Sequence, residues 1–438
     1  MSNPTDIAVI GGGWSGLAAA VTLTQQGKPV HLFEAAGQLG GRARTIELNH
    51  LTVDNGHHLF VGAYRQLIAL LATLDVDLST VFRRENFSLN MQVNEKKIHL
   101  PSSSLPAPFN LLSSLLRASN ISPGEKTHAL IKGFALRKLP DSLTNDISVA
   151  AIFNKMRYPK QLIDTIWAPL CLAICNTKIA DTSAQNFFNA IHQTFFLERD
   201  YSDILYPIKN LSDIIPATAS TYLTRNNAKI SLKQRVKSIL IENNTIYGIK
   251  TNDVVIPVKN IILAVPPPAV IKLLDSSEDC QTLVTQLSQI NFAPICTLYI
   301  HYPCAVTLPA PMLGVTNKTT QWVFDRQYEN QAGLIAVIIS GNGPHQNLKQ
   351  SELEQLVTKE IAEIFPDWPA PLHVKVLWEK RATFTCCPGI NTLRPEYKTS
   401  VKGLWLAGDY TQTGLPATLE GAVQSGVQCA QQLFETLD

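Results

Sequence analysis

Three glycines near the N-terminus constrain this chain more than any other feature. Gly11, Gly13 and Gly16 follow an apolar run at 7–10 and precede a run at 17–23 with the composition of a helix. In this spacing the first glycine permits a tight turn, the second lets a pyrophosphate approach the backbone, and the third lets the helix pack closely on the strand. The segment predicts a strand–turn–helix unit that binds a dinucleotide.

A carboxylate follows the next apolar run. Val30 to Phe33 leads directly into Glu34, roughly 20 residues after the glycines, where an acid can accept hydrogen bonds from both ribose hydroxyls. Because this acid repels a 2′-phosphate, FAD or NAD is favoured over NADP. The alternative is a glycine-rich turn that packs a helix on a strand and binds nothing.

A second segment of this kind lies near the C-terminus. An apolar run at 404–407 precedes Gly408 and Asp409, and a helical pattern begins at Thr418 and Leu419. Glycine lets the backbone approach a ligand, and the carboxylate can accept from a ligand hydroxyl. The N–H groups that open the last helix favour an electron-rich ligand edge. The alternative is an aspartate that only caps a structural turn.

Composition excludes several classes of protein. The chain has 438 residues, enough for two or three domains, and a net charge of +2, which does not predict a nucleic-acid binder. It has no run of 18 apolar residues and no basic-then-apolar start, so neither a transmembrane helix nor a signal peptide is expected. The eight cysteines form no paired C-x-x-C array, which favours reduced, buried thiols in the cytoplasm and no metal site.

The middle of the chain is expected to return to the nucleotide-binding unit. Strands are predicted at 228–239 and 245–250, joined by a turn at Asn243–Asn244, and a buried strand at 261–265 ends at two prolines. Two long insertions separate these pieces, so the chain is predicted to interleave two domains.

The residues after Glu34 carry a family resemblance. The sequence GQLGGRA at 37–43 resembles the second half of the fingerprint of flavin amine oxidases and phytoene desaturases. The resemblance implies FAD as the cofactor, with Gly41 letting the backbone pass it. Arg42 would lie near the diphosphate and form charge-assisted hydrogen bonds with it.

Further motifs narrow the resemblance. NGHHLFVGAYR at 55–65, WAPLCLAICNT at 167–177, SAQNFF at 183–188 and EKRATFTCCPG at 379–389 look like the bacterial hydroxysqualene dehydroxylase family, also called squalene-associated FAD-dependent desaturases. The resemblance implies reductive conversion of hydroxysqualene to squalene in hopanoid synthesis. It also implies a hydrophobic C30 isoprenoid substrate, an unidentified electron donor, and a cytoplasmic protein held peripherally on the inner face of the cytoplasmic membrane.

The resemblance also implies a fold and a cofactor site. It predicts an α/β protein in which a Rossmann-like FAD-binding domain of glutathione-reductase type (1–75, 211–290 and 386–438) is interleaved with a mixed α+β substrate domain (76–210 and 291–385). The residues expected at FAD are Gly11, Gly13, Trp14, Ser15, Gly16, Glu34, Ala35, Gly41, Arg42, Gly56, His57, Val236, Gly408, Asp409, Thr418 and Leu419.

The proton donor for such a reaction has several candidates. His57, His58, Asp54 and Asp325 are the main ones, because histidine and carboxyl groups are the usual general acids. Each also has a structural explanation: Asp54 opens a turn, adjacent histidines point in different directions, and Asp325 stands beside Arg326 as an ion pair would.

A helix at 109–117 is a candidate membrane contact. Phe109, Leu112, Leu115 and Leu116 share one face in a helical projection, beside Arg117, as in helices that lie in a bilayer interface. Packing on the domain core would give the same pattern.

Three functions stay open for the whole chain. They are a hydroxysqualene reductase, another enzyme of the same fold (a carotenoid-type desaturase or isomerase, or an amine oxidase), and a prenyl-lipid-binding protein without catalysis.

Overall fold

A parallel five-stranded sheet forms the nucleotide-binding end of the molecule. The computed structural model describes residues 7–48, 51–139, 143, 145–252, 254–275 and 277–437. All four strand pairs of the sheet are parallel. The strand order is β10 (Lys229–Ser231), β2 (Val30–Phe33), β1 (Ile7–Ile10), β14 (Asn260–Leu263) and β20 (Leu404–Leu406). Strands from three distant parts of the chain thus share one sheet, as the resemblance predicts.

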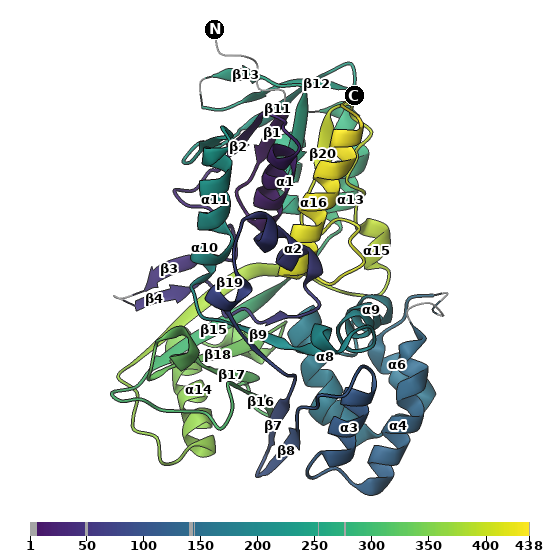
Figure 1. Ribbon diagram of the computed structural model, residues 1–438, viewed down its shortest axis with the longest axis vertical. Helices are drawn as coiled ribbons and strands as arrows, with labels where there is room; N and C mark the ends of the chain where they lie inside the picture. The colour runs from purple at the N-terminus through teal and green to yellow at the C-terminus, as the bar shows by residue number, and fades with distance from the viewer. Residues whose placement is uncertain are drawn as a thin grey trace.

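Two helices at opposite ends of the sequence lie side by side on this sheet. Helix α1 (Trp14–Gln25) follows β1, and α16 (Leu419–Glu435) follows β20. Figure 1 shows the yellow α16 beside the purple α1. Their close approach depends on Gly426, because a Cβ there would lie 2.1 Å from the carbonyl oxygen of Ser15.

One predicted strand is wrong. The residues 228–239 form two strands in different sheets: β10 joins the parallel sheet, whereas β11 (Ser238–Glu242) pairs with β12 (Thr245–Lys250). Lys233 breaks the run with a φ of +55°, so the intervening segment turns across the end of β2 before β11 begins. The turn at Asn243 and Asn244 is as predicted, with positive φ at both residues.

A second sheet fills the other end of the molecule. It has seven strands, with one parallel pair between β16 and β7, and α14 (Gln350–Ile364) packs beside it. The strand order is β19 (His373–Phe384), β15 (Phe292–His301), β18 (Leu334–Ser340), β17 (Trp322–Asp325), β16 (Met312–Thr316), β7 (Leu89–Val93) and β8 (Lys96–Leu100). Its long strands β15 and β19 reach toward the nucleotide-binding end (Figure 1).

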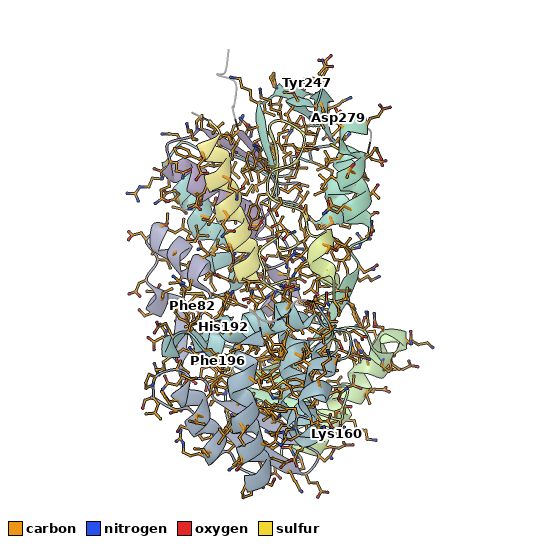
Figure 2. All side chains as sticks on the ribbon, turned by 90° about the vertical axis from the view of Figure 1, so that its right-hand side faces the viewer. Phe82, Lys160, His192, Phe196, Tyr247 and Asp279 are labelled. Carbon is orange, nitrogen blue, oxygen red and sulfur yellow. The ribbon has the colours of Figure 1, made fainter. Side chains whose placement is uncertain are left out.

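A group of helices stands beside the second sheet. Buried aromatic side chains of α6 and α9 meet the ring of Trp167, with Phe153 and Phe188 5.8 Å apart between ring centroids. Lys160 marks the far end of this group and Tyr247 the opposite end of the molecule (Figure 2). The helices are α3 (Phe109–Arg117), α4 (Pro123–Arg137), α6 (Val149–Met156), α7 (Lys160–Leu162), the π-helical η2 (Ile163–Trp167), α8 (Ala168–Cys175) and α9 (Ala184–Phe195).

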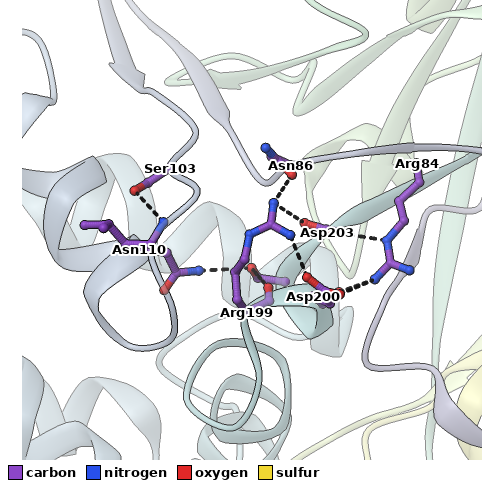
Figure 3. Close-up of polar contacts among 9 residues, drawn as sticks. Arg84, Asn86, Ser103, Asn110, Arg199, Asp200 and Asp203 are labelled. Carbon is purple, nitrogen blue, oxygen red and sulfur yellow. Dashed lines mark hydrogen bonds and ion pairs between the residues drawn. The ribbon is translucent and has the colours of Figure 1, made fainter.

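A polar cluster ties the base of the helical group to a small sheet of β5 (Phe60–Val61), β9 (Ile204–Pro207) and β6 (Phe82–Glu85). Arg84 Nε lies 2.8 Å from Asp203 Oδ2. The guanidinium of Arg199 contacts Asp200 and Asp203 as well (Figure 3). Since both arginines are partly exposed, these pairs fix the turn after α9 more than they add stability.

Candidate cofactor and active site

The turn between β1 and α1 forms a cradle for an anion. Gly11 has a φ of +108°, and a Cβ at Gly16 would lie 1.9 Å from the Gly11 carbonyl oxygen, so neither position tolerates a side chain. Helix α1 begins after Gly13 without any side-chain cap, and the buried hydroxyl of Ser15 has no partner among the described residues. Free N–H groups and an unpaired hydroxyl at a helix N-terminus suit a phosphate.

Glu34 holds the next part of the site. Its carboxylate accepts hydrogen bonds from the N–H of Gly12 and the N–H of Ala36, each at 2.7 Å. The backbone N–H of Gln234 donates to the Glu34 carbonyl at 2.9 Å, which brings the chain leading to the buried Val236 beside the end of β2. Ala35 lies between the two bonded positions. The ends of β1 and β2 and the 233–236 segment therefore meet at one place, beside the carboxylate that was expected to bind the ribose.

The segment after Glu34 crosses directly over the start of α1. The N–H of Gly40 donates to the Gly12 carbonyl at 2.8 Å, and a Cβ at Gly41 would lie 3.1 Å from Gly13 Cα. The indole N–H of Trp14 donates to the Ala43 carbonyl at 2.8 Å. The buried Trp14 side chain thus anchors this segment, and only its backbone is left to face a ligand.

Arg42 joins the two ends of the chain. Its Nη2 lies 2.7 Å from Oδ1 of Asp409, and its Nη1 donates to the Ala382 carbonyl at 2.6 Å. Burial opposes the charge of Arg42, but Asp409 and Glu379 outweigh it and raise the pKa of the guanidinium. The structure therefore places Arg42 against Asp409, beside the cradle.

Arg394 organises the loop that carries Asp409, and no sequence motif pointed to it. Its guanidinium is almost fully buried and donates to the carbonyls of Thr411, Leu415 and Asp409 at 2.7, 2.8 and 3.1 Å. It also donates to Thr413 Oγ1 at 2.6 Å. Burial lowers the pKa of Arg394 to about 10. One buried cation thus shapes the whole turn between β20 and α16.

The start of α16 is capped within the protein. Thr418 Oγ1 accepts from the N–H of Gly421 at 3.0 Å, so Thr418 is the N-cap and Leu419 the first helical residue. Glu420 turns to another helix, α2 (Arg65–Thr73), and accepts from the N–H groups of Gln66 and Leu67. Burial raises the pKa of Glu420 to about 7.

A buried charged cluster lies beside the segment that bears Gly56. Arg326 is fully buried and forms an ion pair with Glu329, and its Nη2 lies 4.0 Å from Oδ2 of Asp54. Its Nη1 lies 3.4 Å from Nδ1 of His57, whose ring packs on Phe324 at 4.1 Å between centroids. Sequence reasoning named His57 and Asp54 but missed Glu329.

The other two catalytic candidates, Asp325 and His58, make different contacts from those of the buried charged cluster. Asp325 accepts from Gln327 and from the N–H of Leu308, so it shapes a turn, and Arg326 pairs with Glu329 instead of with this neighbour. His58 is partly buried near Arg42, and burial followed by that charge lowers its pKa to about 4. Gly56, which has a φ of +92°, lies between Asp54 and the two histidines.

Comparison with known proteins identifies the family. The family described as flavin containing amine oxidoreductase matches residues 14–434. The chain belongs to this family. It is an FAD-dependent oxidoreductase. The two-unit α/β fold also recurs in an oxidoreductase from Methanosarcina mazei, with a TM-score of 0.76, 18% identity, and coverage of 98% of this chain and 100% of the other.

The relatives confirm the narrower resemblance. A protein named hydroxysqualene dehydroxylase from Sinorhizobium fredii is 27% identical over 98% of each chain. A zeta-carotene desaturase from Zea mays is 22% identical over 96% of this chain and 82% of its own length. Both kinds of relative span nearly the whole sequence, so the likeness extends beyond the nucleotide-binding motif.

The residues present fit FAD. The cradle is free of Cβ atoms at Gly13, and Ser15 supplies an unpaired hydroxyl at the helix N-terminus. Glu34 is bonded to this cradle through the N–H of Gly12, and Arg42 pairs with Asp409 beside it. We infer that these residues would hold the diphosphate, the ribose and the ribityl region. Gly56 and His57 would lie nearer the isoalloxazine.

Proposed function

We propose that this family member converts hydroxysqualene to squalene by reductive removal of the allylic hydroxyl. The observation that carries the proposal is the relative named hydroxysqualene dehydroxylase, which matches 98% of the chain. The overall change replaces a C–OH bond by a C–H bond and releases water. Bound in its reduced form, FAD supplies the hydride for that bond.

The protein's own residues would prepare the reaction. Hydroxysqualene is almost entirely apolar, so binding would place its hydroxyl at one of the few polar groups near the isoalloxazine. We propose that the buried cluster of His57, Arg326 and Glu329 supplies these polar groups. Ionisation of an allylic C–O bond requires a proton on the leaving oxygen and a site from which bulk water is excluded.

Anaerobic turnover tests this function. The purified holoenzyme would be reduced chemically, mixed with hydroxysqualene in detergent, and followed by the flavin spectrum and by lipid extraction. Squalene formed as the flavin reoxidises supports the proposal. An unchanged spectrum with solubilised substrate contradicts it. Oxidation of a carotenoid precursor by oxidised enzyme would favour the desaturase alternative, which the zeta-carotene desaturase relative supports.

An apolar patch suggests how the substrate is reached. The described helices include none long and apolar enough to cross a bilayer. Phe109 and Leu116 of α3 are 54% and 53% exposed, with Leu105 before the helix and Ile131 on α4 exposed as well. Leu115 of the same helix is partly buried against the core, as the core-packing alternative predicts. We propose that the four exposed side chains, with Arg117 nearby, rest on the inner face of the cytoplasmic membrane.

Vesicle binding tests the patch. Phe109→Ser with Leu116→Ser should weaken co-sedimentation with vesicles of anionic and zwitterionic lipid by about tenfold, given the apolar area removed. Tyr247→Ser is the matched control, because Tyr247 is 51% exposed at the opposite end of the molecule (Figure 2). Equal binding by the double variant and the control would contradict the proposal.

The reductant of the flavin would be a separate reductase or soluble reduced flavin.

A further inference from the structure

The ring of His57 has one partnered and one unpartnered nitrogen. Its side chain is 4% exposed, and Nε2 has no hydrogen-bond partner among the described residues. Nδ1 lies 3.4 Å from Nη1 of Arg326. A guanidinium can only donate, so Nδ1 accepts and the ring proton is on Nε2. His57 therefore presents a buried N–H that lacks an acceptor.

Glu329 stands behind this ring. Its side chain is 4% exposed, and Oε1 lies 3.7 Å from Nδ1 of His57. A closing movement of roughly 0.5–1 Å would make a hydrogen bond. The single cation Arg326 faces two buried carboxyl groups, Glu329 and Asp54. Burial, followed by the charge of Asp54, outweighs Arg326 and raises the pKa of Glu329 to about 7, so about half of the Glu329 side chains carry a proton at pH 7 and more do below it.

The cluster is continuous with the cofactor cradle. Asn55 Nδ2 donates to the carbonyl of Arg42 at 3.0 Å, and Arg42 pairs with Asp409. Tyr299 closes the other side, with its hydroxyl donating to the Asp54 carbonyl at 2.9 Å and its ring beneath the Arg326 guanidinium. A hydroxyl bound against the isoalloxazine region would be the acceptor that His57 lacks.

We propose that Glu329 and His57 form the proton relay that expels the substrate hydroxyl, with Arg326 as the residue that positions both. The inference rests on the proposed function. His57 Nε2–H gives its proton to the hydroxyl oxygen. Nδ1 exchanges its 3.4 Å contact with Arg326 for a bond to Glu329 and takes the proton of Glu329. The C–O bond breaks with its electron pair on oxygen, which leaves as water. Reduced FAD, when bound, would supply as reductant the hydride that the allylic cation needs, and Glu329 would remain as a carboxylate paired with Arg326.

The charged and titratable groups around the relay define its pH dependence. Glu329 is the acid, so the rate of reductive dehydroxylation is highest below about pH 7 and falls as Glu329 ionises above it. The pKa of His57 is held well below 6.5 by burial, Arg326 and His58, so the ring stays neutral through this range. The facing groups are Asp54, Arg326, Tyr299, His58 and, beyond His58, Arg42.

Single-turnover kinetics of the reduced holoenzyme test the relay. Glu329→Gln keeps the shape of the side chain and removes its proton, and should slow squalene formation about 100-fold or more. The slow reaction should also lose its dependence on pH between 6 and 9. Glu329→Asp should restore part of the rate together with the falling limb. Glu363→Gln, on the exposed surface beside Lys318, is the matched control and should behave as wild type.

Each outcome decides the proposal. A Glu329→Gln enzyme with wild-type rate, or one that is slow but keeps the wild-type pH profile, overturns the relay while the proposed function stands. If that variant does not fold, the wild-type profile decides, because a rate that does not fall above pH 7 excludes the relay. A wild-type enzyme that forms no squalene at any pH overturns the proposed function, and the relay with it.

Discussion

Substitution of Gly426 by alanine should disrupt the packing of α1 against α16. The added Cβ would lie 2.1 Å from the Ser15 carbonyl oxygen and 2.9 Å from Ala18 Cβ, whereas ordinary contacts begin at 3.4 Å. No rotamer relieves this clash, because a Cβ is fixed to the backbone, so the helices must separate by roughly 1 Å or more. Overpacking typically costs 1–3 kcal/mol. The backbone-to-backbone contact places this case at the upper end, about 3 kcal/mol.

The separation of α1 and α16 should also weaken the binding of FAD. Ser15 lies in the cradle, and Ser425 Oγ accepts from the N–H of Gly408 at 2.9 Å, so both sides of the site move with the two helices. We expect Gly426→Ala to lose FAD on dilution, which the flavin absorbance after gel filtration measures. Urea unfolding of the apoprotein would give the loss of stability.

A second glycine provides the control for this prediction. An added Cβ at Gly133 in α4 would meet no tertiary contact within 4 Å among the described residues, so Gly133→Ala should raise stability by about 0.5–1 kcal/mol. The reasoning is refuted if Gly426→Ala retains full flavin and unfolds within about 0.5 kcal/mol of wild type.

Three further predictions concern single side chains. Arg394→Met removes the four guanidinium bonds to Asp409, Thr411, Thr413 and Leu415 and should cost about 3 kcal/mol in urea unfolding; a loss below 1 kcal/mol would contradict the role of Arg394. Asp409→Asn weakens the charged pair with Arg42 and should lower FAD affinity about tenfold or more, as measured by fluorescence titration; unchanged affinity would contradict it. The pKa of His31 is lowered by burial, and then by Lys229, to about 4. The unfolded chain therefore takes up this proton first, and stability falls as pH drops from 6.5 toward 4. His31→Gln should flatten that fall in thermal unfolding, and an unchanged slope would contradict it.

The parts of the fold that are local in sequence could be predicted. The run from β1 through α1 to β2 follows from an apolar stretch, three glycines and a helical pattern between residues 7 and 33. The last helix follows from its periodicity. The prediction of one strand at 228–239 was wrong because tertiary contacts divide the segment. Backbone hydrogen bonds to Glu34 and Ala36 hold its middle as a turn, and this contact cannot be inferred from the composition of the segment.

The candidate active site could be predicted only in part. His57 and Asp54 stand in a recognisable segment, but Arg326 lies 269 residues from His57 and was named only as an ion-pair neighbour of Asp325. Glu329 follows it by three residues in a short helical turn. Arg394 lies outside the glycine-rich motif whose loop it holds. Such pairings depend on how β15 and β17 bring distant segments together, which single-sequence patterns do not encode.

Turnover in heavy water tests the central claim most directly. The holoenzyme would be reduced anaerobically in D₂O, so that the transferable hydrogen of the flavin is deuterium, and then mixed with hydroxysqualene. The account predicts squalene equal in amount to the flavin oxidised, with one deuterium on the carbon that bore the hydroxyl. Unlabelled squalene, or flavin that stays reduced beside intact hydroxysqualene, would contradict it.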